Sequence, residues 1–377
     1  MNITNTKNIS AALCLSVLLL AACGGGGGGG GSSTPPVTAH AVTPRFAYVS
    51  NMNSGMISAY TINATTGALS TETLTASLRV GLYTVTATPN GKFLYTTNQN
   101  SLNVSVFSID HATGALTAGT PVPVGAGGST NMGVAVDPAG KFAYVLNRVA
   151  NTSSVITVFT IDPITGALTA TGATAAAGTW PESIKLTPNG KFAFVANNSG
   201  NNVSVFSVNQ STGDLTAGTA IGAGTSPNSI AVHPSSKFVY VSNSGSKDIS
   251  VYTADQTTGA LTAGTAVTCG NYPDSVAVDP TGRFAYVANQ NSNDVWVYTI
   301  NQTSGALTFS TLQAASPTPS SIAVDPSGKF VYVTTSGANP NPDSILVYTI
   351  DQTTGALTYV SSALADLLAV SIAIVGQ

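Results

Sequence analysis

A unit of 46 to 50 residues, repeated seven times, determines what this chain can fold into. The unit is represented by 283–308, RFAYVANQNSNDVWVYTINQTSGALT. Its copies open with phenylalanines at seven positions: Phe46, Phe93, Phe142, Phe192, Phe238, Phe284 and Phe330. A sequence period in the forties with strand-like content is typical of a propeller or a solenoid. The repeats therefore predict one domain, although a length of 377 residues alone would suggest more than one.

Four short strands are predicted in each repeat. In the last copy strand A spans 321–324, strand B 330–333, strand C 345–350 and strand D 356–359. Turn-forming residues separate the strands, and every copy has a glycine in its C–D turn, at positions 67, 114, 166, 213, 259, 305 and 355. We therefore predict an all-β, seven-bladed β-propeller with four-stranded blades, whose closure leaves no long exposed sheet edge. A β-solenoid is the alternative, but its rungs are usually shorter than these repeats.

The two ends of the repeat region are predicted to complete one blade together. Strand A begins 15 or 16 residues after the preceding turn glycine in blades three to seven, and 15 residues after Gly355 lies Val370. The segment 370–375 reads as one more strand A with no strand B after it, whereas the first repeat lacks a clean strand A. The carboxyl-terminal strand is thus expected to be the inner strand of the amino-terminal blade.

Residues 1–22 have the features of a secretory signal peptide. A single cation, Lys7, precedes an apolar run over 11–22 that is too short to span a bilayer. The run ends in Leu-Ala-Ala followed by Cys23, which resembles the lipobox of bacterial lipoproteins. The resemblance implies that Cys23 is lipidated and becomes the first residue of the exported protein. An ordinary signal peptide with an incidental cysteine is the alternative.

The segment 23–40 is predicted to be a flexible tether between the lipidated cysteine and the propeller, which spans 41–377. It contains an unbroken run of glycines over 24–31, followed by Ser, Thr and Pro. By the sorting rule of bacterial lipoproteins, Gly24 after the cysteine implies the outer membrane, on its periplasmic or cell-surface face. Charged residues make up only 7% of the chain and the net charge is −3, so we expect no nucleic-acid partner. The propeller is expected to be a monomer.

The repeated strand and turn motifs resemble those of known propellers. Strand B reads YVSN over 48–51 and 240–243 and YVAN over 286–289, which is similar to the Tyr-Val-Thr-Asn repeat of surface-layer propellers. Together with the DPxGKF and TGAL turns, the pattern resembles the lactonase family of seven-bladed propellers, which includes 6-phosphogluconolactonase-type and muconate-lactonising enzymes. The resemblance covers roughly residues 41–377.

The catalytic residues that the resemblance implies are not found. Enzymatic members are expected to carry His, Arg and Glu near the central channel, in a Gly-Pro-Arg-His stretch before a strand A and an Asn-Glu after the next strand B. The best-placed segment, 225–228, keeps only the Pro, and the following strand B ends in Asn243-Ser244. His233 matches a turn histidine of the pattern, but we predict that it is a solvated turn residue. Catalytic residues therefore stay unassigned.

A candidate ligand site follows from the positions where the repeats differ. The first residue of strand A is Tyr83, Met132, Glu182, Asn228, Asp274, Ser320 or Val370 in the seven blades. Glu182, Asn228 and Asp274 come from consecutive blades and are predicted to converge at the channel mouth, while Lys185 stands where most blades have Ala. These residues can bind a polar ligand, or the two carboxylates a divalent cation; no cofactor is predicted and no metal ligand is assigned. Single solvated substitutions are the alternative.

Two functions remain open. The first is an exported, membrane-anchored propeller that acts as a binding or structural scaffold. Its unknown protein or small-molecule partner would bind the face formed by the B–C loops and D–A connections, because these differ most between repeats. The B–C loops over 147–154 and 336–344 are the longest. The second is a lactone hydrolase, similar to 6-phosphogluconolactonase, with a rearranged active site. The sequence also predicts that Cys269 is an inert thiol.

Overall fold

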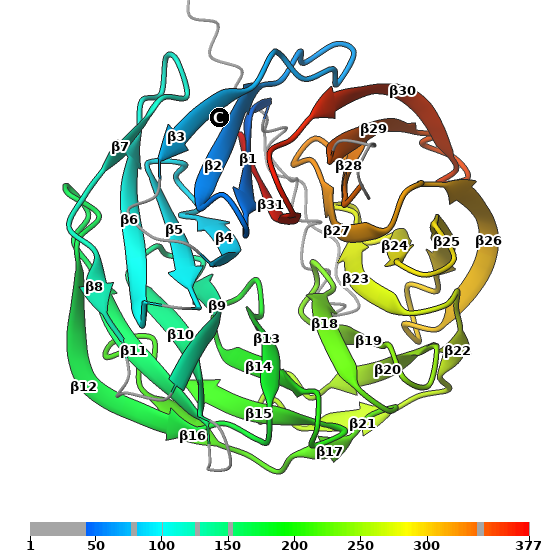
Figure 1. Ribbon diagram of the computed structural model, residues 1–377. Helices are drawn as coiled ribbons and strands as arrows, with labels where there is room; N and C mark the ends of the chain where they lie inside the picture. The colour runs from blue at the N-terminus through cyan, green and yellow to red at the C-terminus, as the bar shows by residue number, and fades with distance from the viewer. Residues whose placement is uncertain are drawn as a thin grey trace, which may run out of the picture. The chain divides into compact units, whose positions relative to one another are not determined.

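The structure, a computed structural model, describes residues 43–76, 81–99, 101–124, 129–149, 154–337 and 343–376. The predicted signal peptide, Cys23 and tether lie outside these residues. Within the described part every regular element is a β-strand, and the strands form seven antiparallel sheets. The sheets are arranged around a central space, as Figure 1 shows. The fold is therefore the predicted all-β, seven-bladed β-propeller.

Each blade has the same strand order from the centre outward. The innermost strands are β31 (Ala369–Gly376), β4 (Leu82–Ala87), β9 (Ser129–Val136), β13 (Pro181–Leu186), β18 (Pro227–Val232), β23 (Pro273–Val278) and β27 (Pro319–Val324). The second strands are β1 (Pro44–Asn51), β5 (Phe93–Asn98), β10 (Phe142–Val149), β14 (Phe192–Asn197), β19 (Phe238–Asn243), β24 (Phe284–Asn289) and β28 (Phe330–Thr335). The third strands are β2 (Met56–Thr61), β6 (Asn103–Ile109), β11 (Val155–Ile161), β15 (Asn202–Val208), β20 (Asp248–Ala254), β25 (Asp294–Ile300) and β29 (Ser344–Ile350).

The outermost strand is continuous in four blades and split in three. The continuous strands are β3 (Thr73–Ala76), β12 (Leu168–Ala176), β26 (Leu307–Ala314) and β30 (Leu357–Leu364). The split strands are β7 (Leu116–Ala118) with β8 (Val122–Pro123), β16 (Leu215–Ala217) with β17 (Ile221–Gly222), and β21 (Leu261–Ala263) with β22 (Val267–Thr268). Both pieces of a split strand pair with the same third strand, so four strand positions per blade are kept.

The ring closes through the carboxyl-terminal strand, as predicted. Strand β31 pairs antiparallel with β1 over nearly its whole length, and the first sheet has the order β3-β2-β1-β31. Figure 1 shows β31, in red, beside β1, in blue. The buried side chains of Ile372 and Val375 belong to the cores on either side of this blade. One strand from the end of the chain thus completes the blade that the start of the chain begins.

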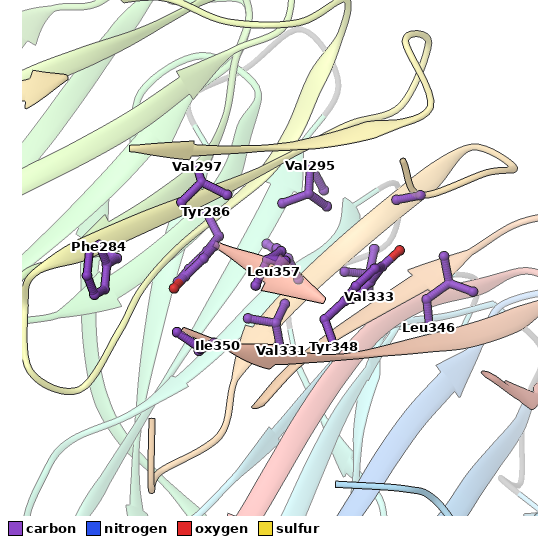
Figure 2. Close-up of a cluster of buried hydrophobic side chains, with 13 residues drawn as sticks. Phe284, Tyr286, Val295, Val297, Val331, Val333, Leu346, Tyr348, Ile350 and Leu357 are labelled. Atoms are coloured by element: carbon purple, nitrogen blue, oxygen red, sulfur yellow. The ribbon is translucent and has the colours of Figure 1, made fainter. Parts of the chain in front are cut away.

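The hydrophobic core lies between neighbouring blades. Figure 2 shows one such cluster, in which Tyr286 and Val297 of one blade meet Val331 and Tyr348 of the next. These side chains come from the second and third strands, whose alternating residues point to the two faces of each sheet. Because both faces of a blade are covered by its neighbours, the second strands of all seven blades are buried at all or nearly all of their described residues.

The turn glycines are required by the contacts between blades. Each has φ between +71° and +79°, and a Cβ there would lie 2.4 to 2.5 Å from a phenylalanine ring of the preceding blade. The ring of Phe330 meets Gly67 in this way, across the point where the chain closes. In five blades the tyrosine of the second strand also donates a hydrogen bond to that glycine's carbonyl oxygen. The repeated Phe, Tyr and Gly therefore fasten one blade to the next.

His233 is buried, so the prediction that it is a solvated turn residue is wrong. Its side chain is only 4% exposed, and Nε2 lies 2.9 Å from the carbonyl oxygen of Gly282 in the next blade. Nδ1 lies 3.1 Å from the backbone nitrogen of Ser235, which donates to it. The turn of the neighbouring blade covers the imidazole, an effect that the local sequence around residue 233 does not show.

Candidate functional site

A β-bulge lies at the start of each innermost strand, and three of the four predicted site residues, Glu182, Asn228 and Asp274, are the extra residues of these bulges. In β13 the pairing passes from Pro181 directly to Ser183, so that Glu182 has no partner on β14. Asn228 and Asp274 are skipped in the same way in β18 and β23. A bulge redirects the side chain of its extra residue, and bulges are common beside functional sites. The repeated bulge thus explains why the variable residues face the channel mouth.

One cavity of about 480 Å³ occupies this end of the channel. Glu182, Lys185, Asn228 and Asp274 all line it, so the structure brings the four predicted residues to one cavity. Its walls also include hydroxyls one residue after the bulge in six of the seven blades, from Thr84, Ser183, Ser229, Ser275, Ser321 and Ser371. The remaining blade has Gly133 there. A cavity of this volume is large enough for a small-molecule ligand.

Glu182 forms an ion pair with an arginine that the sequence did not single out. Arg148 Nη1 lies 3.0 Å from Glu182 Oε1, and both side chains are mostly buried, with exposed fractions of 16% and 13%. The Tyr83 hydroxyl lies 3.3 Å from Oε2 of the same carboxylate. The Arg148 guanidinium also stacks on the ring of Trp180 at 3.9 Å from its centroid, a cation–π geometry. Burial raises the pKa of Glu182, and the charge of Arg148 opposes that rise.

Asp274 belongs to a second row of polar groups. Asn198 Nδ2 donates to Asn228 Oδ1 at 2.6 Å, and Asn228 Nδ2 donates to Asp274 Oδ1 at 3.2 Å. Burial raises the pKa of Asp274 to about 7, and the negative charge of Glu182 adds to this rise. The hydrogen bond from Asn228 acts in the opposite direction. Asp274 is therefore poised to gain or lose a proton near neutral pH.

Lys185 lies deeper in the channel than the other three residues. Its side chain is accessible to water within the channel but is surrounded by protein, and this surrounding lowers the pKa of its ammonium group. No residue of the described ranges forms a hydrogen bond or ion pair with it. Lys185 thus shares the cavity with Glu182 and Asp274 without being paired to either.

Two aromatic side chains at the mouth were missed by the sequence reasoning. Trp180 and Tyr272 are 41% and 40% exposed, and both line the cavity. Each lies two residues before a bulge residue and has a positive φ, 58° for Trp180 and 56° for Tyr272. The equivalent residues Ser226, Thr318 and Leu368 also have a positive φ, so this backbone conformation belongs to the repeated approach to the bulge, and it is the aromatic side chains that distinguish these two blades. The signal available in the sequence was an aromatic residue directly before Pro181 and Pro273, at a position where the other blades carry smaller side chains.

The remaining features of the sequence are Cys269, the potential metal ligands and the two long B–C loops. Cys269 is unpaired and half-buried, and burial raises its pKa to about 12, so it is held as a thiol. Over the described ranges, His, Cys, Asp and Glu side chains nowhere gather in groups of three or more that could hold a metal ion. The described residues also contain no helix long and apolar enough to cross a membrane. The centres of the two long B–C loops, 150–153 and 338–342, lie outside the described residues.

The fold and the channel-mouth cavity define a seven-bladed β-propeller with a polar central site. A family model described as Lactonase, 7-bladed beta-propeller, matches residues 39–132, 119–226 and 217–324, which is more than half of the chain. The chain therefore belongs to the lactonase family of seven-bladed β-propellers. The resemblance to this family that the strand and turn motifs indicated is confirmed. A search of curated protein sequences found no match.

Solved structures share the fold at low sequence identity. A candidate 6-phosphogluconolactonase from Bacteroides uniformis is 19% identical, with a TM-score of 0.76, over 88% of this chain and 100% of that one. A second candidate 6-phosphogluconolactonase, from Bacteroides fragilis, is 22% identical over 90% and 99%, with a TM-score of 0.75. The periplasmic gluconolactonase PpgL of Pseudomonas aeruginosa is 16% identical over 88% and 99%, with a TM-score of 0.74. At these identities the likeness shows the fold alone.

Proposed function

We propose that this protein binds a small, uncharged, polyhydroxylated ring, such as a monosaccharide or its lactone, at the channel mouth. The observation that carries the proposal is the pairing of two exposed aromatic rings, Trp180 and Tyr272, with polar side chains in one cavity. An aromatic face packs against the apolar face of a sugar ring, while Asn198, Asn228 and Asp274 supply hydrogen-bond donors and acceptors to its hydroxyls. The family membership supports a ligand of this class.

Binding is tested by isothermal titration calorimetry with D-glucose and D-glucono-1,5-lactone. The parent protein should bind at least one of them, and Trp180→Ala and Asp274→Asn should each weaken binding by about tenfold or more. Phe309→Ala is a matched control, because this aromatic side chain is exposed on the outermost strand β26, away from the channel. Absence of binding by the parent protein, or equal losses in the control, would reject the proposal.

Lactone hydrolysis is the second candidate, and the pKa of Asp274 favours it. A carboxylate with a pKa of about 7 is suited to accept a proton from water at neutral pH. In this reaction water adds to the lactone carbonyl carbon while Asp274 takes one of its protons. The bond from that carbon to the ring oxygen then breaks, and Asp274 returns the proton to the ring oxygen, which leaves as a hydroxyl. The Asn228 amide lies beside Asp274, where it can hydrogen-bond to a substrate oxygen. The row of Asn198, Asn228 and Asp274 thus replaces the His, Arg and Glu expected of the family's enzymes.

Measurement of turnover distinguishes a binding protein from a lactone hydrolase. Hydrolysis of D-glucono-1,5-lactone, followed by acid release in a weakly buffered solution, should be abolished in Asp274→Asn if the protein is an enzyme. Binding without turnover above the spontaneous rate would identify a binding protein. Turnover that persists in Asp274→Asn would reject the assigned base.

We also propose, from the sequence, that Cys23 anchors the propeller to a bacterial membrane through a lipid. The segment Leu-Ala-Ala-Cys and the glycine run support this proposal. Stable anchoring takes more than one acyl chain, which a lipidated amino-terminal cysteine provides. Mass spectrometry of the mature amino terminus and membrane fractionation of Cys23→Ser test it. A soluble parent protein would contradict the anchor, and an unmodified Cys23 would favour the ordinary signal peptide.

A further inference from the structure

Two blades carry the same three kinds of side chain at equivalent positions around the channel mouth. Each set consists of an aromatic residue two positions before the bulge, a carboxylate at the bulge and an amide directly after the second strand. The sets are Trp180, Glu182 and Asn198 in the blade of β13, and Tyr272, Asp274 and Gln290 in the blade of β23. All six residues line the channel-mouth cavity, which therefore has two similar halves.

The backbone holds the two sets in the same way. The backbone nitrogen of Asn198 donates to Trp180 O at 2.8 Å, and that of Gln290 donates to Tyr272 O at 2.9 Å. The combination of aromatic, carboxylate and amide is found in these two blades alone. In the other five, the three positions are Leu368, Val370 and Met52; Gly81, Tyr83 and Gln99; Thr130, Met132 and Arg148; Ser226, Asn228 and Ser244; and Thr318, Ser320 and Ser336.

The two sets are neighbours in space, because one side chain of the intervening blade joins them. Asn228 of β18 accepts a hydrogen bond from Asn198 Nδ2 at 2.6 Å and donates one to Asp274 Oδ1 at 3.2 Å. At its two other positions this blade has Ser226 and Ser244, which are too small to fill the space between the aromatic rings. A single ligand can therefore contact both sets.

The set on the blade of β23 has polar groups without partners in the described part of the chain. Asp274 accepts the Asn228 hydrogen bond at Oδ1, whereas its Oδ2 has no partner there. The side-chain amide of Gln290 and the hydroxyl of Tyr272 form no hydrogen bond within the described ranges either. A single sugar ring on Trp180, beside the row that ends at Asp274, leaves Tyr272 and Gln290 available to a second ring.

We propose that the channel mouth binds two linked sugar rings, as in a disaccharide, with one ring on Trp180 and the other on Tyr272. This inference rests on the proposed function, because it assigns a second ring to the same cavity. Gln290 and Asp274 Oδ2 supply hydrogen bonds to hydroxyls of the second ring. The cavity volume of about 480 Å³ is that of pockets for drug-sized ligands, and a disaccharide is nearer to this size than a monosaccharide is.

Isothermal titration calorimetry with cellobiose, maltose and D-glucose tests the second ring. The two disaccharides present two glucose rings in different relative orientations. The parent protein should bind at least one of them about tenfold or more tightly than glucose, because binding of the first ring holds the linked second ring close to Tyr272. The quantity to compare between variants is this ratio of disaccharide affinity to glucose affinity.

Two variants give the blade of β23 the residues of its neighbour. Tyr272→Ser introduces the residue type of Ser226, and Gln290→Ser that of Ser244. The affinity ratio should fall toward one in both variants, since each removes a contact with the second ring. Tyr359→Ser is the matched control and should keep the ratio of the parent, because this exposed tyrosine lies on the outermost strand β30.

Three results would overturn the inference. They are disaccharides that bind no more tightly than glucose, an unchanged ratio in Tyr272→Ser, and an equal fall of the ratio in Tyr359→Ser. If glucose or gluconolactone still binds in any of these cases, the single-ring proposal stands and the second ring alone is rejected. Absence of binding by all the sugars tested would reject both proposals.

Discussion

Arg148 Nη1 and Glu182 Oε1 lie 3.0 Å apart, and this ion pair joins the end of β10 to the start of β13 in the next blade. The pair is mostly buried, and Trp180 covers the guanidinium on one side. Removing one partner of a buried pair leaves the other charge without compensation, which costs more than the pair contributes. The geometry of the channel mouth therefore depends on both residues together.

Arg148→Met should lower the free energy of unfolding by about 2 to 3 kcal/mol, somewhat less than for a fully buried pair because both side chains retain contact with water. The double variant Arg148→Met/Glu182→Gln should recover part of that loss. Urea denaturation measures both. Arg283→Met is the control and should change little, because this exposed arginine forms no ion pair in the described structure and its hydrogen bonds, to Thr281 Oγ1 and Gln352 O, lie at the surface. Strictly additive losses in the double variant would contradict the coupling.

The pKa of Asp274, raised to about 7 in the folded state, predicts a pH-dependent stability. Between pH 4 and pH 7 the folded protein holds this proton while the unfolded chain, whose Asp has its ordinary pKa, has lost it. The free energy of unfolding should therefore fall as pH rises through this window, by up to about 1.4 kcal/mol per pH unit from this group.

Asp274→Asn should remove that slope, because an amide does not titrate. Urea denaturation at pH 5, 6, 7 and 8 compares the variant with the parent. Asp255→Asn is the matched control. This exposed turn carboxylate accepts backbone hydrogen bonds that lower its pKa, so it stays ionised over the whole range. If the unfolding free energy of the parent, relative to that of Asp274→Asn, rises with pH, the pKa of Asp274 is not raised in the folded state.

The fold could be predicted because the same structural residues recur in every repeat. Phe, Tyr and the turn glycine recur in register, and these residues form the contacts that fasten each blade to the next. Closure could be predicted for the same reason, since the spacing after Gly355 places one more inner strand at Val370. Repeats with the same spacing of turn and core residues adopt the same backbone structure, so the fold of one repeat predicts that of the others.

The site could be predicted only in part, because its chemistry depends on contacts between blades. Glu182, Asn228 and Asp274 occupy equivalent bulges, so their convergence follows from the repeat. Arg148 was missed because β10 extends past Asn147, where the sequence predicted a loop to begin. Burial of His233 was missed for a related reason, since Gly282 of another blade supplies its partner.

His233 predicts a second pH effect, of opposite sign to that of Asp274. Burial lowers the pKa of the folded imidazole, so the unfolded chain takes up a proton more readily than the folded protein. The contribution of His233 to stability should therefore be lost as pH falls below the ordinary histidine value of about 6.5. His233→Asp should remove this loss, because the equivalent carboxylates of Asp279 and Asp325 accept a hydrogen bond from the backbone of the following phenylalanine.

The measurement is the difference in unfolding free energy between His233→Asp and the parent at pH 5, 6 and 7.5. That difference should move in favour of the variant as pH falls to 5. A constant difference across the series would show that the imidazole does not titrate differently in the two states.

Phe194→Tyr should stabilise the propeller. Phe194 is fully buried at the position where five other blades have a tyrosine that donates to a turn glycine of the next blade. A hydroxyl added there would reach the carbonyl oxygen of Gly259, whose contact with Phe192 matches that of the other turn glycines. A buried hydrogen bond of this kind contributes about 1 kcal/mol. Tyr240→Phe, which removes the 2.9 Å bond to Gly305, is the reciprocal control and should lose a similar amount. Destabilisation by Phe194→Tyr would mean that the hydroxyl is buried without a partner.

Asp343 should control how firmly the ring closes. Its buried carboxylate accepts hydrogen bonds from the backbone nitrogens of Gly337, at 2.6 Å, and of Leu368 and Ala369, where the closing strand β31 begins. Asp343→Ala leaves these buried donors unpaired and should lower the free energy of unfolding by about 2 to 3 kcal/mol. Asp351→Ala removes a carboxylate that also accepts two backbone hydrogen bonds, but at an exposed turn, so its loss should be smaller.

Truncation after Ala369 should destabilise the closed ring more than Asp343→Ala does. It removes most of β31, including the buried side chains of Ile372 and Val375, and leaves β1 as an unpaired edge facing the channel. The melting temperature should fall far more than for Asp343→Ala, and the exposed edge should promote association of the truncated chains. Because Asp343 acts by holding β31, Asp343→Ala introduced into the truncated chain should cost less than it does in the full chain. Equal costs in the two backgrounds, or an unchanged melting temperature after truncation, would contradict closure of the ring by β31.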